Sequence, residues 1–160
     1  MLLDTVLFLH SLIRWWVLVA CLSTAAYARW AGDAEPTASA RDQRVGKLFV
    51  ASVDVQVLLG MSLWFALSPL SRVARQLWAE RGFGALWAQP ELRFFGVIHP
   101  ALALLGALTA HAIWIAARRA PTREERRRRL ALGAAATLAI LLAAVPWPFL
   151  GHERPWFRFW

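Results

Sequence analysis

The sequence predicts an all-α membrane protein, a single domain over residues 1–160 that folds as a four-helix transmembrane bundle. Its 160 residues are 59% hydrophobic and include 10 Trp, a composition too apolar for a soluble domain of this size. Each of four apolar windows supplies about 20 residues, the length that crosses roughly 30 Å of hydrocarbon as a helix. These windows lie near residues 5–28, 48–69, 94–117 and 130–150.

The positive charges predict how the bundle is oriented. Although the net charge is +8, the basic residues flank the apolar windows and do not form a face interleaved with aromatic residues, so we expect a lipid bilayer and no nucleic acid as partner. One side of the bilayer holds 11 of them, namely Arg29, Arg41, Arg44, Lys47, Arg118, Arg119, Arg123 and Arg126–Arg129. The other side holds 6, namely Arg72, Arg75, Arg81, Arg93, Arg154 and Arg158. The positive-inside rule therefore predicts a multi-pass protein with its N and C termini on the outer (periplasmic) side.

The segments between the windows carry further local signals. Residues 71–93 alternate arginines with aromatic and aliphatic residues, which predicts an interfacial loop that rests on the membrane. Thr122, followed three residues later by Glu125, predicts a capping box at the start of the last helix. The aromatic C-terminal tail, residues 154–160, is interpreted as an interfacial anchor, with a docking peptide for a partner subunit as the alternative.

Polar side chains inside the apolar windows are the most informative residues, because such groups are costly in a bilayer and usually mark a function. They are His10, Arg14, Asp54, Gln56, His99 and His111. His10 and His99 each lie about five residues inside the outer end of a window, roughly 8 Å deep, so we expect them to face each other. Asp54, Gln56 and His111 form a second polar layer nearer the cytoplasmic side.

Two histidines at matching depth on different helices predict one bis-histidine haem b, provided that the helices leave room for its rim. Small residues follow His99 at helical spacing, with Gly106 among them, and Gly60 follows Gln56 by one turn on the second window. These stripes have a second interpretation, since small residues are also how transmembrane helices pack together.

Arg14 and His111 each have two interpretations. Arg14 lies one turn from His10 on the same face, where its charge needs an anion, either a haem propionate or Asp54. We expect His111 to be hydrogen-bonded, paired with Asp54, while a role in a proton path is the alternative. His152 is expected at the surface rather than as a replacement haem ligand.

Four stretches of this sequence resemble a family of small four-helix bacterial integral membrane proteins labelled cytochrome b-like. They are residues 10–15 (HSLIRW), residues 56–61 (QVLLGM), the histidine at position 99, and residues 145–149 (VPWPF). The resemblance covers the whole chain in matching order. It implies that His10 and His99 are the family's characteristic histidines and Arg14 its arginine, in a protein of the bacterial inner membrane.

These observations lead to one principal function and one alternative from a different class. The principal expectation is a membrane electron-transfer protein with one b-type haem between the first and third windows, which exchanges electrons with a quinone or a partner redox subunit of a respiratory complex. No phosphate loop, nucleophile elbow or zinc-protease motif predicts a self-contained enzyme. The alternative is a haem-free accessory or assembly subunit of a larger membrane complex.

Overall fold

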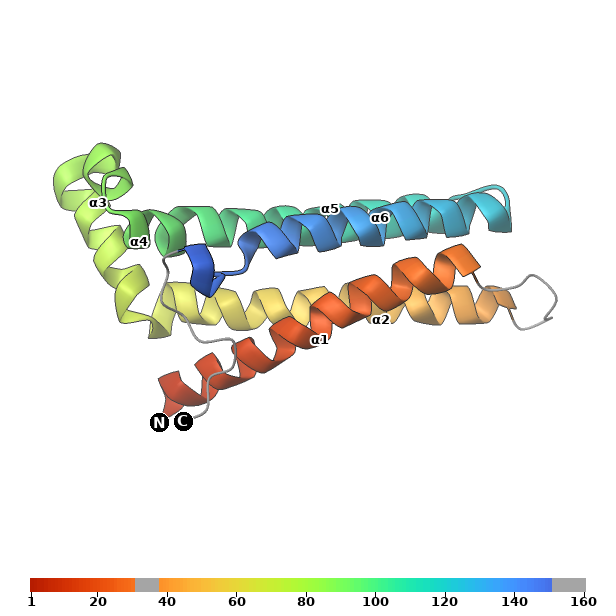
Figure 1. Ribbon diagram of the computed structural model, residues 1–160, viewed down its shortest axis with the longest axis horizontal. Coiled ribbons are helices and arrows are strands. Elements are labelled where there is room, and N and C mark those ends of the chain that lie inside the picture. The colour runs from red at the N-terminus through yellow and green to blue at the C-terminus, as the bar shows by residue number, and fades with distance from the viewer. Residues whose placement is uncertain (31–37, 151–160) are drawn as a thin grey trace.

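Four long helices lie side by side in the structure, a computed structural model that describes residues 1–30 and 38–150 (Figure 1). They are α1 (Leu2–Trp30), α2 (Ala38–Ser62), α5 (His99–Arg118) and α6 (Arg123–Ala144). Helices α1 and α2 form one layer and α5 and α6 the other. The described residues contain no strand, so the predicted all-α fold is confirmed.

The fold has more helices than the four that the sequence predicts. Two shorter helices, α3 (Pro69–Trp87) and α4 (Pro90–Arg93), connect the two layers at one end of the bundle (Figure 1). Residues 71–93 are therefore largely helical, and the prediction of a loop was wrong. Ser68-Pro69, which in sequence marks a helix stop, is also the start of the next helix: the Ser68 hydroxyl accepts a hydrogen bond from the Ser71 amide (3.3 Å), and proline suits the first helical position.

Non-α turns flank α3 and α4 on both sides. A π-helical turn, η1 (Leu63–Leu67), ends the α2 rod, and a second, η2 (Phe94–Ile98), precedes α5. The Trp64 indole of η1 donates to the Gly96 carbonyl of η2 (3.1 Å), which ties the two turns together. Arg75 of α3 donates to the carbonyls of Trp64 and Phe65, so α3 is held against the open carbonyl end of η1.

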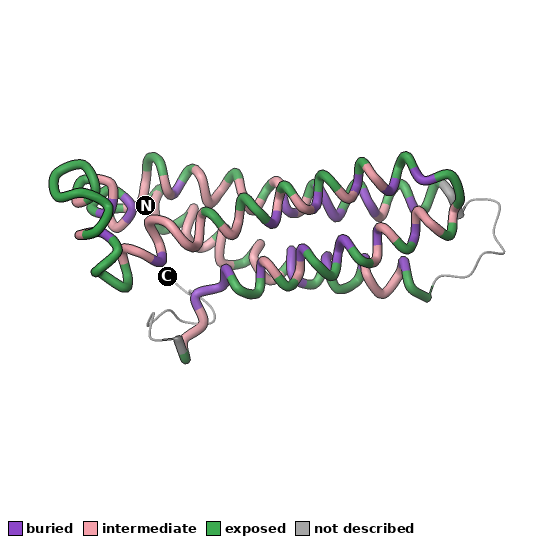
Figure 2. Tube along the Cα trace, turned by 90° about the horizontal axis from the view of Figure 1, so that it is seen from above, coloured by how far each residue is buried: buried purple, intermediate pink, exposed green. Residues whose placement is uncertain are grey.

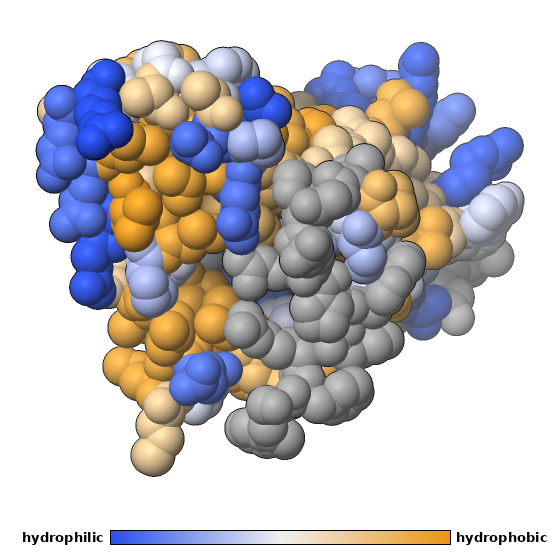
Figure 3. Space-filling model, turned by 60° about the vertical axis from the view of Figure 1, so that its left-hand side comes forward, coloured by the Kyte–Doolittle hydropathy of each residue, from blue (hydrophilic) through white to orange (hydrophobic). Residues whose placement is uncertain are grey.

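Three helical stretches are long and apolar enough to cross a membrane: Leu2–Trp30, Ala40–Leu67 and Pro90–Arg118. The predicted fourth span, 130–150, is shorter as a helix than expected, because α6 ends at Ala144 and a 3₁₀ turn (Pro148–Leu150) follows. Its apolar part, 130–144, has about 15 residues and a length of about 22 Å. Hydrophobic residues cover much of the flank of the molecule in Figure 3, and these spans indicate a membrane protein.

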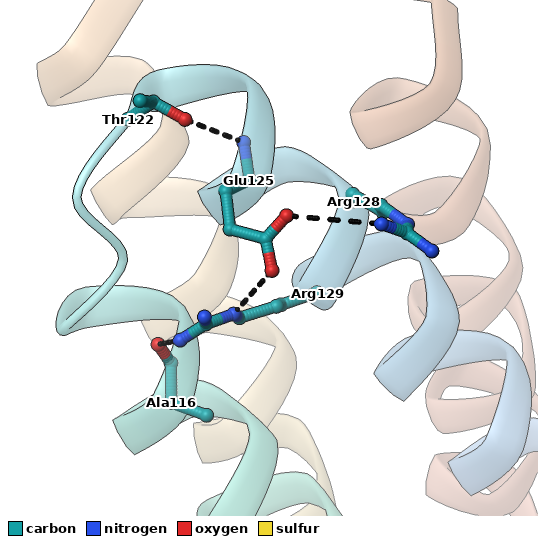
Figure 4. A network of polar contacts seen from close by, with 5 residues as sticks. All are labelled: Ala116, Thr122, Glu125, Arg128 and Arg129. Carbon is teal, nitrogen blue, oxygen red and sulfur yellow. Dashed lines mark hydrogen bonds and ion pairs between the residues drawn. The ribbon is translucent and has the colours of Figure 1, made fainter.

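We call the end of the bundle that carries α3 and the N-terminus the open end, and the end with the α5–α6 turn the closed end. At the closed end the Thr122 hydroxyl accepts from the Glu125 amide (3.1 Å), which confirms Thr122 as an N-cap (Figure 4). The Glu125 carboxylate accepts from Arg129 (2.9 Å), and Arg129 also donates to the Ala116 carbonyl (2.9 Å). This network fixes the start of α6 against the end of α5.

A buried carboxylate joins three helices at the closed end. Asp42 has no exposed surface, and its carboxylate accepts from the Tyr27 hydroxyl (2.9 Å) and from Arg123 Nε (3.1 Å). The predicted window for the second helix began at residue 48, but α2 begins at Ala38. Asp42 therefore lies on a helix and links α2 to α1 and α6.

Close packing is concentrated toward the closed end (Figure 2). The buried residues of α1 are Val17, Leu18, Cys21, Thr24 and Ala28, all in its second half. Figure 1 shows the reason: the first half of α1 diverges from α5 and α6 toward the N-terminus. The bundle is therefore tightly packed at one end and spread apart at the other.

Candidate functional site

The divergence of α1 leaves a cavity of about 600 Å³ at the open end, within the range of pockets that hold small molecules and cofactors. All four long helices contribute to its wall, and the first turn of α3 closes it. The lining residues are Leu3, Leu7, His10, Ser11, Arg14, Leu18, Gln56, Val57, Gly60, Met61, Leu63, Trp64, Ser68, Pro69, Leu70, Ser71, Val73, Phe95, His99, Pro100, Ala103, Leu141, Ala144, Val145 and Pro146. Most of this wall is apolar, with a few polar groups converging from α1, α2 and α5.

His10 of α1 and His99 of α5 both line this cavity, and their ring centres are 6.1 Å apart. The ring planes are inclined by 72°. Two imidazoles bound on opposite sides of one metal ion, each at about 2 Å, have ring centres about 6 Å apart. The predicted proximity of these two side chains is confirmed. Their spacing also fits two histidines that bind one metal ion from opposite sides.

His99 is oriented by its neighbours on α6 and η2. Its Nδ1 is 2.7 Å from the Ala144 carbonyl and donates a hydrogen bond to it. The other ring nitrogen, Nε2, is then unprotonated and can bind a metal ion. The rings of Phe94 and Phe95 lie beside it, with centres 5.9 Å and 6.1 Å away. His99 follows directly on the π-helical turn η2, and such turns are frequent at functional sites.

His10 is held from the side of α2. The Gln56 amide nitrogen lies 3.3 Å from both ring nitrogens and donates to the His10 carbonyl (3.2 Å). The Gln56 side-chain oxygen is buried and has no hydrogen-bond partner among the described residues. One turn further along α2, a Cβ at Gly60 would lie 3.2 Å from His10 Cε1, so glycine leaves the ring its space.

The position of Gln56 corrects the predicted second polar layer. We expected Gln56 there with Asp54 and His111, but it lies in the cavity wall beside His10. The two residues Asp54 and Gln56 are separated by about 200° around a helix, so they point to opposite sides of α2. Only Asp54 and His111 share the second layer, where His111 Nε2 is 2.8 Å from Asp54 Oδ1. The predicted Asp54–His111 pair is confirmed.

Arg14 lines the cavity one turn below His10, as its spacing predicted. Its guanidinium donates to the Ser11 hydroxyl (3.3 Å) and lies 5.2 Å from the centre of the Trp15 ring. Asp54, one of its two predicted partners, is paired with His111 instead. Arg14 therefore places a cationic group against the cavity, where a bound acidic group would meet it.

Gly106 and His152 lie apart from this arrangement. Gly106 does not line the cavity but is buried in the contact between α5 and α6, where a Cβ would lie 2.8 Å from Leu141 Cδ2. His152 and the aromatic tail, 154–160, lie outside the described residues.

Sequence reasoning missed the part of the wall that comes from α3. Pro69, Leu70 and Ser71 close the cavity, and Trp64 and Phe95 line it from the two π-helical turns. The available signal was Ser68-Pro69, an N-cap followed by proline at the first helical position.

Comparisons with protein-family models, curated proteins and solved structures give no match for this chain. Among the described residues, no group of three or more His, Cys, Asp and Glu side chains is placed to hold a metal ion. A haem requires only two side chains, because the porphyrin supplies the remaining ligands to its iron.

Proposed function

We propose that this protein is a membrane electron-transfer protein that binds one b-type haem between His10 and His99. The observation that carries the proposal is the 6.1 Å separation of two imidazole rings across one cavity of about 600 Å³. A haem held by two histidines supplies one-electron redox chemistry at its iron.

The residues around the cavity have separate tasks in this proposal. The Ala144 carbonyl fixes the tautomer of His99 that leaves Nε2 unprotonated and able to bind iron, and Gln56 holds His10 from α2. Arg14 balances the negative charge of an acidic edge of the cofactor. The apolar wall and α3 limit the access of water. Such surroundings would favour the ferrous form of a bound haem, whose iron–porphyrin core has no net charge, and would thereby raise its reduction potential.

The finer topology belongs to the same proposal. Four crossings by α1, α2, α5 and α6 would place the closed end, with Arg118, Arg119 and Arg126–Arg129, in the cytoplasm of a bacterium. The cavity and both termini would then lie on the periplasmic side of the membrane, and a quinone within the bilayer or a partner redox subunit would exchange electrons with the site.

The test is an absorption spectrum of the full chain, expressed with ample haem and purified in detergent. We expect a Soret band that shifts on reduction and an α band in the reduced protein. His10→Ala and His99→Ala should each abolish these bands, because each removes one of the two side chains that would hold the haem iron. His111→Ala is the matched control, since it makes the same change on the same helix as His99 but outside the cavity.

Loss of folding is separated from loss of a ligand by rescue. Added imidazole should restore the bands of the His10→Gly and His99→Gly variants if these side chains bind iron. A colourless wild-type protein would overturn the proposal. Absorption bands that persist in both the His10→Ala and the His99→Ala proteins would also overturn it.

A second function, a haem-free accessory subunit, is favoured by one observation. Both histidines already connect helices: Gln56 of α2 contacts His10 of α1, and His99 of α5 contacts Ala144 of α6. A colourless protein that migrates with a larger complex on native gels would support this function, and removal of residues 153–160 would show whether the tail docks that complex.

A further inference from the structure

The Asp54–His111 pair lies within the apolar part of the bundle. Asp54 follows Lys47 by seven residues on α2, and His111 precedes Arg118 by seven residues on α5. Each therefore lies about 10 Å along its helix from the nearest basic residue at the closed end. The pair connects two helices that are each long and apolar enough to cross a membrane.

This pair does not face the interior of the bundle. The side chains of His111 and Asp54 are 48% and 42% exposed. Their one hydrogen bond joins His111 Nε2 to Asp54 Oδ1, and among the described residues the other ring nitrogen and the other carboxylate oxygen have no partner. Titratable side chains inside a membrane almost always face protein or water, because hydrocarbon solvates them poorly. A half-exposed pair at this depth therefore needs a polar group from outside the chain.

The surface around the pair is apolar. One turn toward the open end, Leu58 of α2 and Leu108 of α5 are 67% and 68% exposed. Ala51 on α2 and Ile115 on α5 are exposed one turn toward the closed end. An apolar face with one polar pair at its centre has the composition of a helix–helix interface in a membrane.

We propose that a second copy of this chain covers this face, in a two-fold symmetric dimer that packs α2 of each copy against α5 of the other. A two-fold axis along the membrane normal keeps both copies in the same orientation and brings the two pairs together at equal depth. The free carboxylate oxygen of Asp54 then meets the free ring nitrogen of His111 in the other copy. The carboxylate oxygen accepts a hydrogen bond, and the ring nitrogen donates one when both nitrogens of the ring carry a proton. The face is therefore complementary to itself.

The first test uses cysteines that leave the pair intact. Leu58→Cys and Leu108→Cys, on two differently tagged copies expressed together, should form a disulfide-linked dimer when membranes are oxidised. Leu132→Cys is the matched control: it makes the same change at an exposed position (61%) on α6, outside the proposed interface, and it should give no disulfide-linked dimer. The native Cys21 is fully buried and should not react.

The second test addresses the pair itself. Light scattering of the purified full chain should give a protein mass of twice 18.0 kDa. Asp54→His should lower the dimer fraction, and the exchange variant Asp54→His/His111→Asp should restore it, because the exchange again places a carboxylate opposite an imidazole.

Three outcomes would overturn the proposal. They are a monomer at every protein-to-detergent ratio, equal cross-linking through Leu132→Cys, and cross-linking of Leu58→Cys or Leu108→Cys to a different protein in place of the second copy. None of these tests depends on haem, so the dimer and the proposed function succeed or fail separately.

Discussion

The buried carboxylate of Asp42 allows a quantitative prediction about the closed end. Asp42→Ala removes the acceptor of two hydrogen bonds, from the Tyr27 hydroxyl and from Arg123 Nε. Hydrogen bonds to a charged group contribute about 1.5–3 kcal/mol each, so their sum sets an upper limit of about 6 kcal/mol. The Arg123 side chain remains 24% exposed and water replaces part of the loss, so we expect about 3 kcal/mol.

Two further variants accompany Asp42→Ala: Asp42→Asn makes a smaller change at the same residue, and Asp4→Asn is the control at an exposed acid. Asp42→Asn keeps the shape of the side chain and one acceptor oxygen, and we expect it to cost about half as much as Asp42→Ala. Asp4→Asn changes a carboxylate that is 67% exposed and contacts the N-terminal amine at 3.0 Å. Exposed ion pairs contribute about 0–1 kcal/mol, so Asp4→Asn should leave the free energy of unfolding almost unchanged.

The assay is equilibrium unfolding of the full chain in mixed micelles, followed by circular dichroism as the fraction of denaturing detergent rises. Tyr27→Phe alone should cost about 1 kcal/mol, and added to Asp42→Ala it should cost nearly nothing, because the hydroxyl has already lost its acceptor. If Asp42→Ala and Asp4→Asn shift the transition equally, the carboxylate does not hold these helices together and the reasoning is refuted.

Two further predictions concern helix packing and capping, and both are measured in the same unfolding assay. Gly133→Ala should destabilise the fold by about 1–3 kcal/mol, because the new Cβ would lie 2.7 Å from Ile113 Cβ, whereas Gly84→Ala, with no atom within 4 Å of its Cβ, should be neutral or stabilising. Equal effects of the two glycine substitutions would contradict this packing. Thr122→Ala should cost about 1 kcal/mol through loss of the hydrogen bond to the Glu125 amide, and the serine variant, which keeps the hydroxyl, should cost less. A serine variant no more stable than the alanine variant would show that the cap does not contribute.

The sequence was most informative where a pattern is local to one helix. The apolar windows predicted the centres of the long helices, and Thr122 predicted the start of α6 because a capping hydroxyl acts within one turn. The depths of His10 and His99 predicted their proximity, since depth follows from the rise of a helix once its ends are known.

The sequence was less informative where the direction of a side chain decides whether a residue lines the cavity. Depth alone placed Gln56 with Asp54, although the rotation between them points Gln56 into the cavity. Small residues do not reveal whether they leave space or fill it: Gly60 leaves space beside His10, while Gly106 admits Leu141. That distinction depends on which helix lies opposite, and one sequence does not contain this information.

Residues 38–47 show the same difficulty for polar segments. Their basic residues suggested a connection in water, so the prediction began the second helix at residue 48 and overlooked Asp42. In the structure these residues extend α2 beyond the apolar window, and Tyr27 and Arg123 surround the carboxylate from two other helices. Hydropathy indicates which residues suit a lipid environment. It does not indicate how far a helix extends beyond them, because contacts with other helices stabilise the extension.

The tight packing at the closed end accounts for the cavity at the open end. At the closed end glycines let helices approach: a Cβ at Gly46 would lie 2.8 Å from Trp114 Cη2, and Gly133 meets Ile113 in the same way. Because these contacts and Asp42 fix the helices there, the divergence of α1 accumulates toward its N-terminus (Figure 1). The cavity with His10 and His99 follows from this divergence. Substitutions at the closed end that weaken its packing should therefore change the separation of the two histidines, although none of them touches the cavity.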